Sequence, residues 1–184
     1  MIKRNSVFTI LTAMFAAVYA VSVYLLTPIS FLPFQVRVAD ALLPLAILFG
    51  WPAIIGLSMG AFVANLFGPL GVVDIAGGTL ANFIATFLAW KISRNKGRFW
   101  KLIGVVEEIA TVTLIVGTYL SYVLAQPLLL VWIGVLLGSV LAIGVLGSAL
   151  LFALSTEGSL NLLRSHGLTL ETLASKRAER CVQQ

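Results

Sequence analysis

Residues 41–67 of this chain read ALLPLAILFGWPAIIGLSMGAFVANLF, an apolar stretch with one interruption at Gly50-Trp51-Pro52. A helix needs about 20 consecutive, mostly apolar residues to cross the hydrocarbon core of a bilayer. The stretch is long enough for one kinked spanning helix, and it also fits a tight pair of shorter helices. Choosing between the two determines the topology of the whole chain.

The sequence as a whole has the composition of a membrane protein. It is 60% hydrophobic and 10% charged, with a mean hydropathy of +1.05, whereas soluble domains carry about 25% charged residues. A single water-soluble core in 184 residues has no room for so much apolar surface. The polar segments are too short to form a soluble domain, so we expect an all-α membrane protein.

The positive charges favour the pair of helices. Lys3 and Arg4 flank the first apolar run, and five Lys and Arg residues lie between positions 91 and 101. Cytoplasmic loops of membrane proteins are enriched in Lys and Arg, so an even number of crossings must separate these two regions. Val7–Leu26 and Ile75–Trp90 supply two crossings. Residues 41–67 must therefore cross twice, turning at Gly50-Trp51-Pro52.

The complete prediction is a bundle of six transmembrane helices with both termini cytoplasmic. It comprises a transmembrane domain over residues 1–156 and a cytoplasmic tail over 157–184. The six helices are Val7–Leu26, the pair that begins at Val36 and divides at Gly50-Trp51-Pro52, Ile75–Trp90, Leu102–Leu124 and Leu128–Leu154, with a loop at Thr27–Arg37. Eleven of the twelve Lys and Arg residues then face the cytoplasm. The short pair would be tolerated beside a cavity filled by water or substrate.

The single outer cation, Arg37, stands three residues before Asp40 at the start of the second helix. Residues at that spacing share one face of a helix, and charges inside membrane segments mark function or a specific pair. Two interpretations stay open here: a pair that contacts or gates a ligand, and a structural clasp at the interface.

A second group of polar residues surrounds the outer turn between the third and fourth helices. It includes Asn65, and Asp74, which could instead cap the fourth helix by accepting backbone N–H bonds. Gly77 and Gly78 allow either another helix or a ligand to approach the backbone closely. Inside the fourth span, a polar stripe faces protein or a cavity rather than lipid; its members are Thr79, Asn82 and Thr86.

A third group lies on the fifth helix. Glu107 and Glu108 are adjacent, so only one of them can point squarely inward. They either reach out to Lys91 or Lys101 or meet a ligand that is cationic or rich in N–H groups. Tyr119, nearer the outer face, either belongs to an interfacial aromatic belt or offers a ring on which a flat heterocycle can stack.

The first helix carries small residues four apart, a spacing that lets another helix pack closely; they are Ala13, Ala16, Ala17 and Ala20. No phosphate-binding lysine loop, nucleophile elbow or metal-ligand spacing occurs in the sequence. We therefore expect no enzyme, no metal and no cofactor. The net charge of +5 follows from topology and requires no nucleic acid.

Two motifs resemble a known family. Phe34-Gln35-Val36-Arg37-Val38-Ala39-Asp40-Ala41-Leu42, followed by Leu43-Pro44, resembles the QueT family of substrate-binding S components of energy-coupling-factor (ECF) transporters. Gly60-Ala61-Phe62-Val63-Ala64-Asn65-Leu66, with Gly71, Asp74-Ile75 and Gly78, matches the second signature of that family. The likeness covers about Phe31 to Ala89. Asp40 stands where the family pattern has glutamate, and Glu107-Glu108 replaces a more apolar, proline-containing start of the fifth helix.

The resemblance implies an S-component-like bundle of six helices with both termini inside. It also implies a chain that captures a vitamin-like solute near the outer face and joins a membrane coupling subunit and two ATPases. The implied solute is a queuosine precursor, a 7-deazaguanine base, and the implied coupling contact is the alanine pattern of the first helix. A carboxylate could accept two N–H donors from a guanine-like edge. The candidates for binding the base are Arg37, Asp40, Asn65, Asp74, Asn82, Glu107, Glu108 and Tyr119. The alternatives are an S component for another vitamin and a membrane scaffold that binds no solute.

Overall fold

The computed structural model describes residues 4–26 and 37–165, and within these ranges the chain is helical apart from short turns. The predicted loop Thr27–Arg37 therefore lies outside the described residues except for Arg37. The same holds for the first predicted turn of the second helix, at Val36, and for the tail beyond Ser165. The all-helical expectation is confirmed for the described part of the chain.

Most expected helices occur, with ends that differ by a few residues. They are α1 (Arg4–Leu25), α4 (Trp51–Leu66), α5 (Val72–Ser93), α6 (Arg98–Val123) and the continuous rod formed by α7 (Leu128–Ser139), η2 (Val140–Gly147) and α8 (Ser148–Leu154). Among the described residues, three stretches are long and apolar enough to cross a membrane; they are Ser6–Leu25, Val72–Ser93 and Leu128–Leu154. α6 has 26 residues, or about 39 Å at the helical rise.

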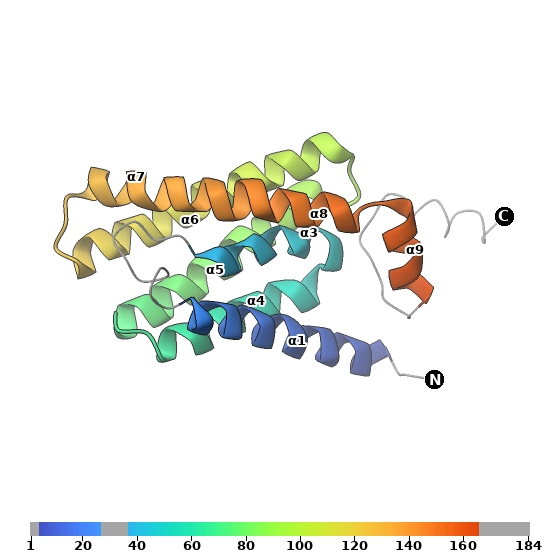
Figure 1. Cartoon of the computed structure of the whole chain (residues 1–184), viewed down its shortest axis with the longest axis horizontal. Helices are drawn as coiled ribbons and strands as arrows, with labels where there is room; N and C mark the ends of the chain where they lie inside the picture. Colours follow the sequence, from blue (N-terminus) through green and yellow to red (C-terminus); the bar gives the residue numbers. More distant parts are fainter. Residues whose placement is uncertain (1–3, 27–36, 166–184) are drawn as a thin grey trace.

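The chain breaks where the charge argument places a turn. η1 (Val38–Leu45) and α3 (Ala46–Phe49) end at Gly50, and α4 begins at Trp51. Gly50 has φ +63°, a left-handed conformation that glycine adopts without the steric cost other residues incur. Pro52 follows in the first turn of α4, where its missing N–H costs nothing. Figure 1 shows the chain reversing at this point, so the stretch forms two helical segments rather than one kinked helix.

The short segment η1 lies at the centre of the bundle. It packs against α1, α4, α5, α6, η2 and α8, whereas α1 packs mainly on α4, and α5 on α4 and α6. Nearly every residue from 38 to 50 is buried. The core of the molecule is therefore built around a helical segment of only eight residues, which follows directly after Arg37.

Two segments of the core are not α-helical. η1 is a 3₁₀ helix with Pro44 inside it, and η2 is a π-helical segment. The two pack against each other, and at Gly147 an added Cβ would lie 2.8 Å from Cγ of Pro44. Pro44 has no N–H to continue an α-helical ladder, which accounts for the irregular winding of η1. The sequence predicted a helix at both places, but it did not predict that one would be a 3₁₀ helix and the other a π-helix.

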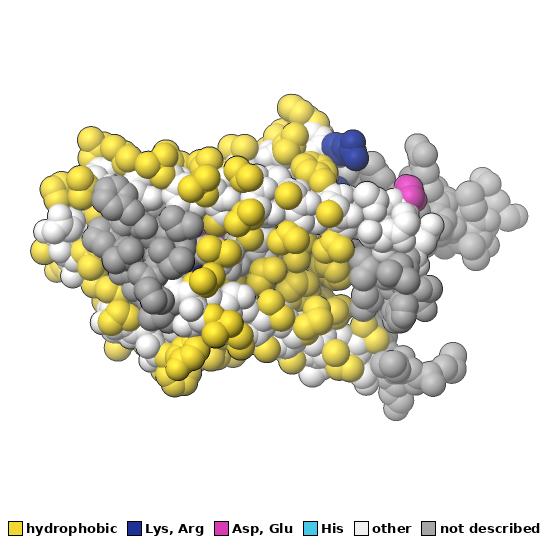
Figure 2. All heavy atoms as spheres, viewed as in Figure 1, with side chains coloured by type: hydrophobic (Ala, Val, Ile, Leu, Met, Phe, Trp, Pro, Cys, Tyr) yellow, Lys and Arg dark blue, Asp and Glu magenta, His cyan; other side chains and the backbone are white. Residues whose placement is uncertain are grey.

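The surface is apolar along the length of the bundle. Figure 2 shows hydrophobic side chains covering the visible face, with its charged side chains at the end next to α9 (Glu157–Ser165). The start of α1, the α5–α6 connection and α9 share that end, and the α4–α5 and α6–α7 turns lie at the other (Figure 1). Exposed apolar side chains on this scale suit a lipid surrounding.

Candidate functional site

Arg37 joins three segments of the chain at the end of the bundle where α4 turns into α5. Its guanidinium Nη2 donates a hydrogen bond to Oδ1 of Asn65 at 3.0 Å and lies 3.7 Å from Oδ1 of Asp74. Asn65 Nδ2 in turn donates to the backbone carbonyl of Asp74 at 2.9 Å. Arg37 is only 5% exposed, so this charge is held inside the bundle by an amide and a carboxylate.

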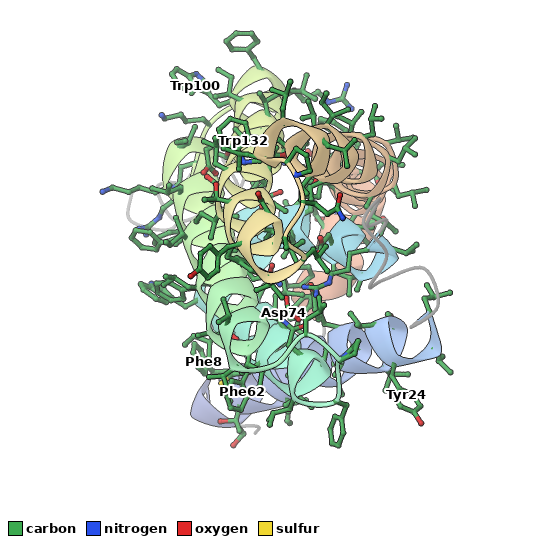
Figure 3. The ribbon with its side chains drawn as sticks, turned by 90° about the vertical axis from the view of Figure 1, so that its left-hand side faces the viewer. Phe8, Tyr24, Phe62, Asp74, Trp100 and Trp132 are labelled. Carbon is green, nitrogen blue, oxygen red and sulfur yellow. The ribbon has the colours of Figure 1, made fainter. Side chains whose placement is uncertain are left out.

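Asp74 connects this group to α6. Oδ1 of Asp74 accepts a hydrogen bond from the Tyr119 hydroxyl at 2.7 Å, while Oδ2 has no hydrogen-bond partner among the described residues. Gly71 caps α5, and no side-chain capping bond is present there. The capping alternative for Asp74 is therefore wrong. Its carboxylate is fully buried and bonded to Tyr119, and Figure 3 places Asp74 among the helices of the bundle.

The two glycines after Asp74 make this assembly possible. At Gly77 an added Cβ would lie 2.7 Å from Cδ1 of the Tyr119 ring, and at Gly78 it would collide with Nδ2 of Asn65. Of the two alternatives for these glycines, the structure shows close approach by neighbouring helices: α6 at Gly77 and α4 at Gly78.

Asp40 lies one turn of η1 beyond Arg37 and has a different partner. The Tyr19 hydroxyl, from α1, donates to Oδ1 of Asp40 at 2.6 Å, and both residues are buried. Sequence reasoning missed Tyr19. The available signal was its place in a four-residue apolar repeat on α1, with Leu11, Phe15 and Val23, which forms the buried face of that helix.

A small cavity lies between η1, α5, α6 and α7. Its lining consists of Arg37, Asp40, Asn82, Val112, Val116, Val135 and Ser139. The space open to the centre of a water-sized sphere is about 10 Å³, close to what one water molecule needs. A ligand the size of a purine therefore enters only if the surrounding helices or side chains move. Three predicted site residues meet in this cavity, and Ser139 is a lining residue that the sequence did not indicate.

Asn82 is the member of the predicted polar stripe with amide groups available for a ligand. Its Nδ2 donates to the Leu57 carbonyl at 3.5 Å, the outer limit for a hydrogen bond. The two threonines of the stripe instead donate to their own helix, Thr79 to Ile75 and Thr86 to Asn82, each at 2.6 Å. The stripe therefore contributes one side chain to the cavity.

The adjacent glutamates of α6 point in different directions, as predicted. Glu108 is 0% exposed, and neither of its carboxylate oxygens has a hydrogen-bond partner among the described residues. Glu107 is half-buried, and its Oε1 accepts a hydrogen bond from Thr111. Lys101 donates to Oγ of Ser155 at 3.0 Å. Neither glutamate forms an ion pair with a described lysine, so the contact with Lys91 or Lys101 is absent for both. Glu108 alone points squarely inward, and Glu107 bonds within its own helix.

The alanines of α1 fall on two faces. Ala13 and Ala17 are exposed, whereas Ala16 and Ala20 are half-buried. At Gly60 of α4, an added Cβ would lie 2.8 Å from the carbonyl oxygen of Ala16. The second face therefore brings α1 against α4 within the chain, and the first remains accessible on the surface.

Within the described residues, no three His, Cys, Asp or Glu side chains are grouped to hold a metal ion.

Comparison with known proteins identifies the family. Searches of curated proteins and of solved structures gave no match. The family model described as QueT transporter matches residues 9–156, which include all of the buried polar residues described above. The chain therefore belongs to the QueT transporter family, a family of membrane transport proteins.

Proposed function

We propose that this chain is the substrate-capture S component of an ECF-type uptake transporter and binds a queuosine precursor, a 7-deazaguanine base, at the outer face of the cell membrane. The observation that carries the proposal is the cavity lined by Arg37, Asp40 and Asn82 in a chain of a transporter family. Polar and ionisable groups inside membrane segments mark substrate sites by default.

The lining suits the edge of a guanine-like base. The Asp40 carboxylate accepts N–H donors of the base, because each of its oxygens has lone pairs beyond the one used by Tyr19. Arg37 contributes N–H donors for a ring carbonyl, and the Asn82 amide both donates and accepts. Val112, Val116 and Val135 provide apolar surface for the ring, as small-molecule sites commonly do.

Asn65, Asp74 and Tyr119 have a supporting role in this proposal. They hold the guanidinium of Arg37 and the start of α5 in place through the bonds at 3.0, 2.9 and 2.7 Å. Groups behind the ligand-contacting residues fix the geometry that recognition needs. Oδ2 of Asp74 is the one atom of this group left to accept a bond from the base.

In the proposed orientation both termini lie in the cytoplasm. The chain spans the membrane six times, with η1 and α3 together forming one span and α4 another. The end of the bundle that holds the start of α1, the α5–α6 connection and α9 is then cytoplasmic, in agreement with the positive-inside rule. The Arg37 group, which consists of Arg37, Asn65, Asp74 and Tyr119, lies toward the opposite end, where α4 turns into α5. A solute would reach it from outside.

A membrane coupling subunit and two ATPases would supply the work of transport, because the sequence has no phosphate-binding loop of its own. The exposed alanines of α1, Ala13 and Ala17, are the proposed contact with the coupling subunit. Their small side chains leave the α1 backbone open to close approach by another helix.

The test is thermal unfolding of the detergent-purified chain in the presence of 7-deazaguanines, guanine and unrelated vitamins. A ligand at one hundred times its Kd adds about 2.7 kcal/mol to the folded state. We expect a shift confined to the deazaguanines and lost in Asp40→Asn. Uptake of a labelled base in cells that supply the coupling subunits is the matching functional assay.

A shift with another vitamin, and none with any deazaguanine, would make the chain an S component for that solute. Absence of any shift in folded protein, together with no dependence of uptake on the chain, would contradict the capture function itself.

A further inference from the structure

The buried charges of the bundle do not balance. Of the described residues, four charged side chains are at most 6% exposed: Arg37, Asp40, Asp74 and Glu108. Three of these are acids and one is a base, and Arg37 pairs with Asp74. Asp40 receives a hydrogen bond from Tyr19, which leaves Glu108 as the acid without a hydrogen-bonding neighbour among the described residues.

Glu108 lies next to the cavity on the same face of α6. Val112 and Val116 follow it by one and two turns, and both line the cavity; each turn advances about 5.4 Å along the axis. Asp40, another lining residue, is close enough to Glu108 for the two acids to interact electrostatically. Glu108 is not itself a lining residue, but it precedes Val112 by one turn and therefore lies beside the cavity, toward the start of α6.

Nothing in the described bundle supplies Glu108 with a positive charge. Lys101, on the same helix, donates to Ser155. Arg94 and Lys96, on the connection that precedes α6, lie over the Trp90 and Trp100 rings, 4.8 and 3.8 Å from the ring centroids. An isolated carboxylate is costly away from water unless it is neutralised or paired. Its counter-charge must then be a proton or a cation that comes from outside the protein.

We infer that Glu108 is a specificity residue that receives the ammonium group of a cationic ligand, so that the site selects a heterocycle carrying a primary amine over a neutral one. The inference rests on the proposed function. With its ring edge at Asp40 and Asn82, the ligand would extend its amine along α6 past Val112 toward Glu108. A charged hydrogen bond formed there restores the balance of buried charge.

A matched pair of ligands tests this directly. The probes are 7-aminomethyl-7-deazaguanine, which carries a cation, and 7-cyano-7-deazaguanine, which is neutral and of similar size. Their dissociation constants are measured by calorimetry on the full chain in detergent. We expect the wild-type protein to bind the amine at least about tenfold more tightly than the nitrile, since hydrogen bonds to charged groups are worth that much or more.

Glu108→Gln should remove most of this preference by weakening binding of the amine, while the nitrile binds as before and reports that the variant is folded. The matched control is Glu107→Gln, which changes the neighbouring glutamate that is half-buried and bonded to Thr111. It should leave both affinities unchanged. Glu108→Asp keeps the charge and should retain part of the preference.

Two outcomes would overturn the inference while the proposed function stands. One is equal binding of the two bases by the wild-type protein. The other is undiminished binding of the amine by Glu108→Gln, which would show that Glu108 holds a proton and takes no part in recognition. Binding of neither base by folded wild-type protein would instead remove the proposed function, and the inference with it.

Discussion

Asp74 and Glu108 are both carboxylates with no exposed surface, yet the protein treats them differently. Asp74 has a guanidinium 3.7 Å away and a tyrosine hydroxyl at 2.7 Å, all provided by the fold. Glu108 has neither kind of partner among the described residues. The comparison separates a carboxylate that the fold pairs from one that it leaves without a partner, and an unpaired buried carboxylate is the better candidate for contact with a ligand.

The largest loss of stability should come from removing the cation that pairs with Asp74. Arg37→Met leaves Asp74 buried without its guanidinium, and breaking one side of a buried pair costs about 3–5 kcal/mol. We expect a large loss of thermal stability in detergent. A melting temperature like that of the wild type would contradict this expectation. It would mean that Asp74 is held by Tyr119 and Asn65 alone.

A second variant tests the close packing around the same group. Gly78→Ala places a Cβ on Asn65 Nδ2, so the amide must shift away from Arg37; overpacking of this kind costs about 1–3 kcal/mol. Gly97→Ala is the control, because a Cβ at Gly97 meets no atom within 4 Å. Equal stability of the two variants would contradict this expectation, because it would show that the Asn65 side chain moves away from the added Cβ without cost.

A smaller effect is expected from the hydroxyl that binds Asp74. Tyr119→Phe removes one donor from a buried carboxylate while Arg37 remains, at a cost of about 1–2 kcal/mol. Tyr122→Phe, at a side chain that is 87% exposed, should change the unfolding free energy by less than about 0.5 kcal/mol. Denaturation of both variants side by side gives the difference in their unfolding free energies. A larger loss of stability from Tyr122→Phe would contradict the role assigned to the Tyr119 hydroxyl.

Glu108→Gln should have the smallest effect on the ligand-free protein, within about 0.5 kcal/mol, or a stabilising one. It replaces a buried acid by a neutral group of the same shape, so no favourable pair is lost. The thermal scan that reports the Arg37→Met loss also measures this value. Destabilisation of similar size in the two variants would show that Glu108 has a structural partner and would erase the contrast with Asp74.

The broad fold was accessible from sequence because hydrophobic length and charge placement act over whole segments. The turn at Gly50-Trp51-Pro52 followed from counting crossings between basic regions, and the chain does break there. Two features were not accessible. The 3₁₀ winding of η1 and the π winding of η2 depend on how Pro44 and Gly147 pack, and that contact joins residues about one hundred positions apart.

The sequence identified the charged residues of the candidate site but not the contacts between them. A charge in an apolar segment is visible in any sequence, so Arg37, Asp40, Asp74 and Glu108 could be singled out. Their pairing could not, since Asp74 is equally suited to capping α5. Tyr19 was missed because a tyrosine in an apolar stripe looks like core, and only the fold places its hydroxyl against Asp40.

The central position of η1 has a consequence for how the protein is made. Arg37 leaves the ribosome before Asn65 and Asp74, and η1 before the α5, α6 and α8 segments that surround it. A nascent chain that ends ahead of Asp74 would have to bury a guanidinium in lipid without its carboxylate, which is costly. The η1–α3–α4 hairpin is therefore expected to settle into the bilayer late, once α5 has been synthesised, so that the buried contacts of Arg37 and the bundle are completed together.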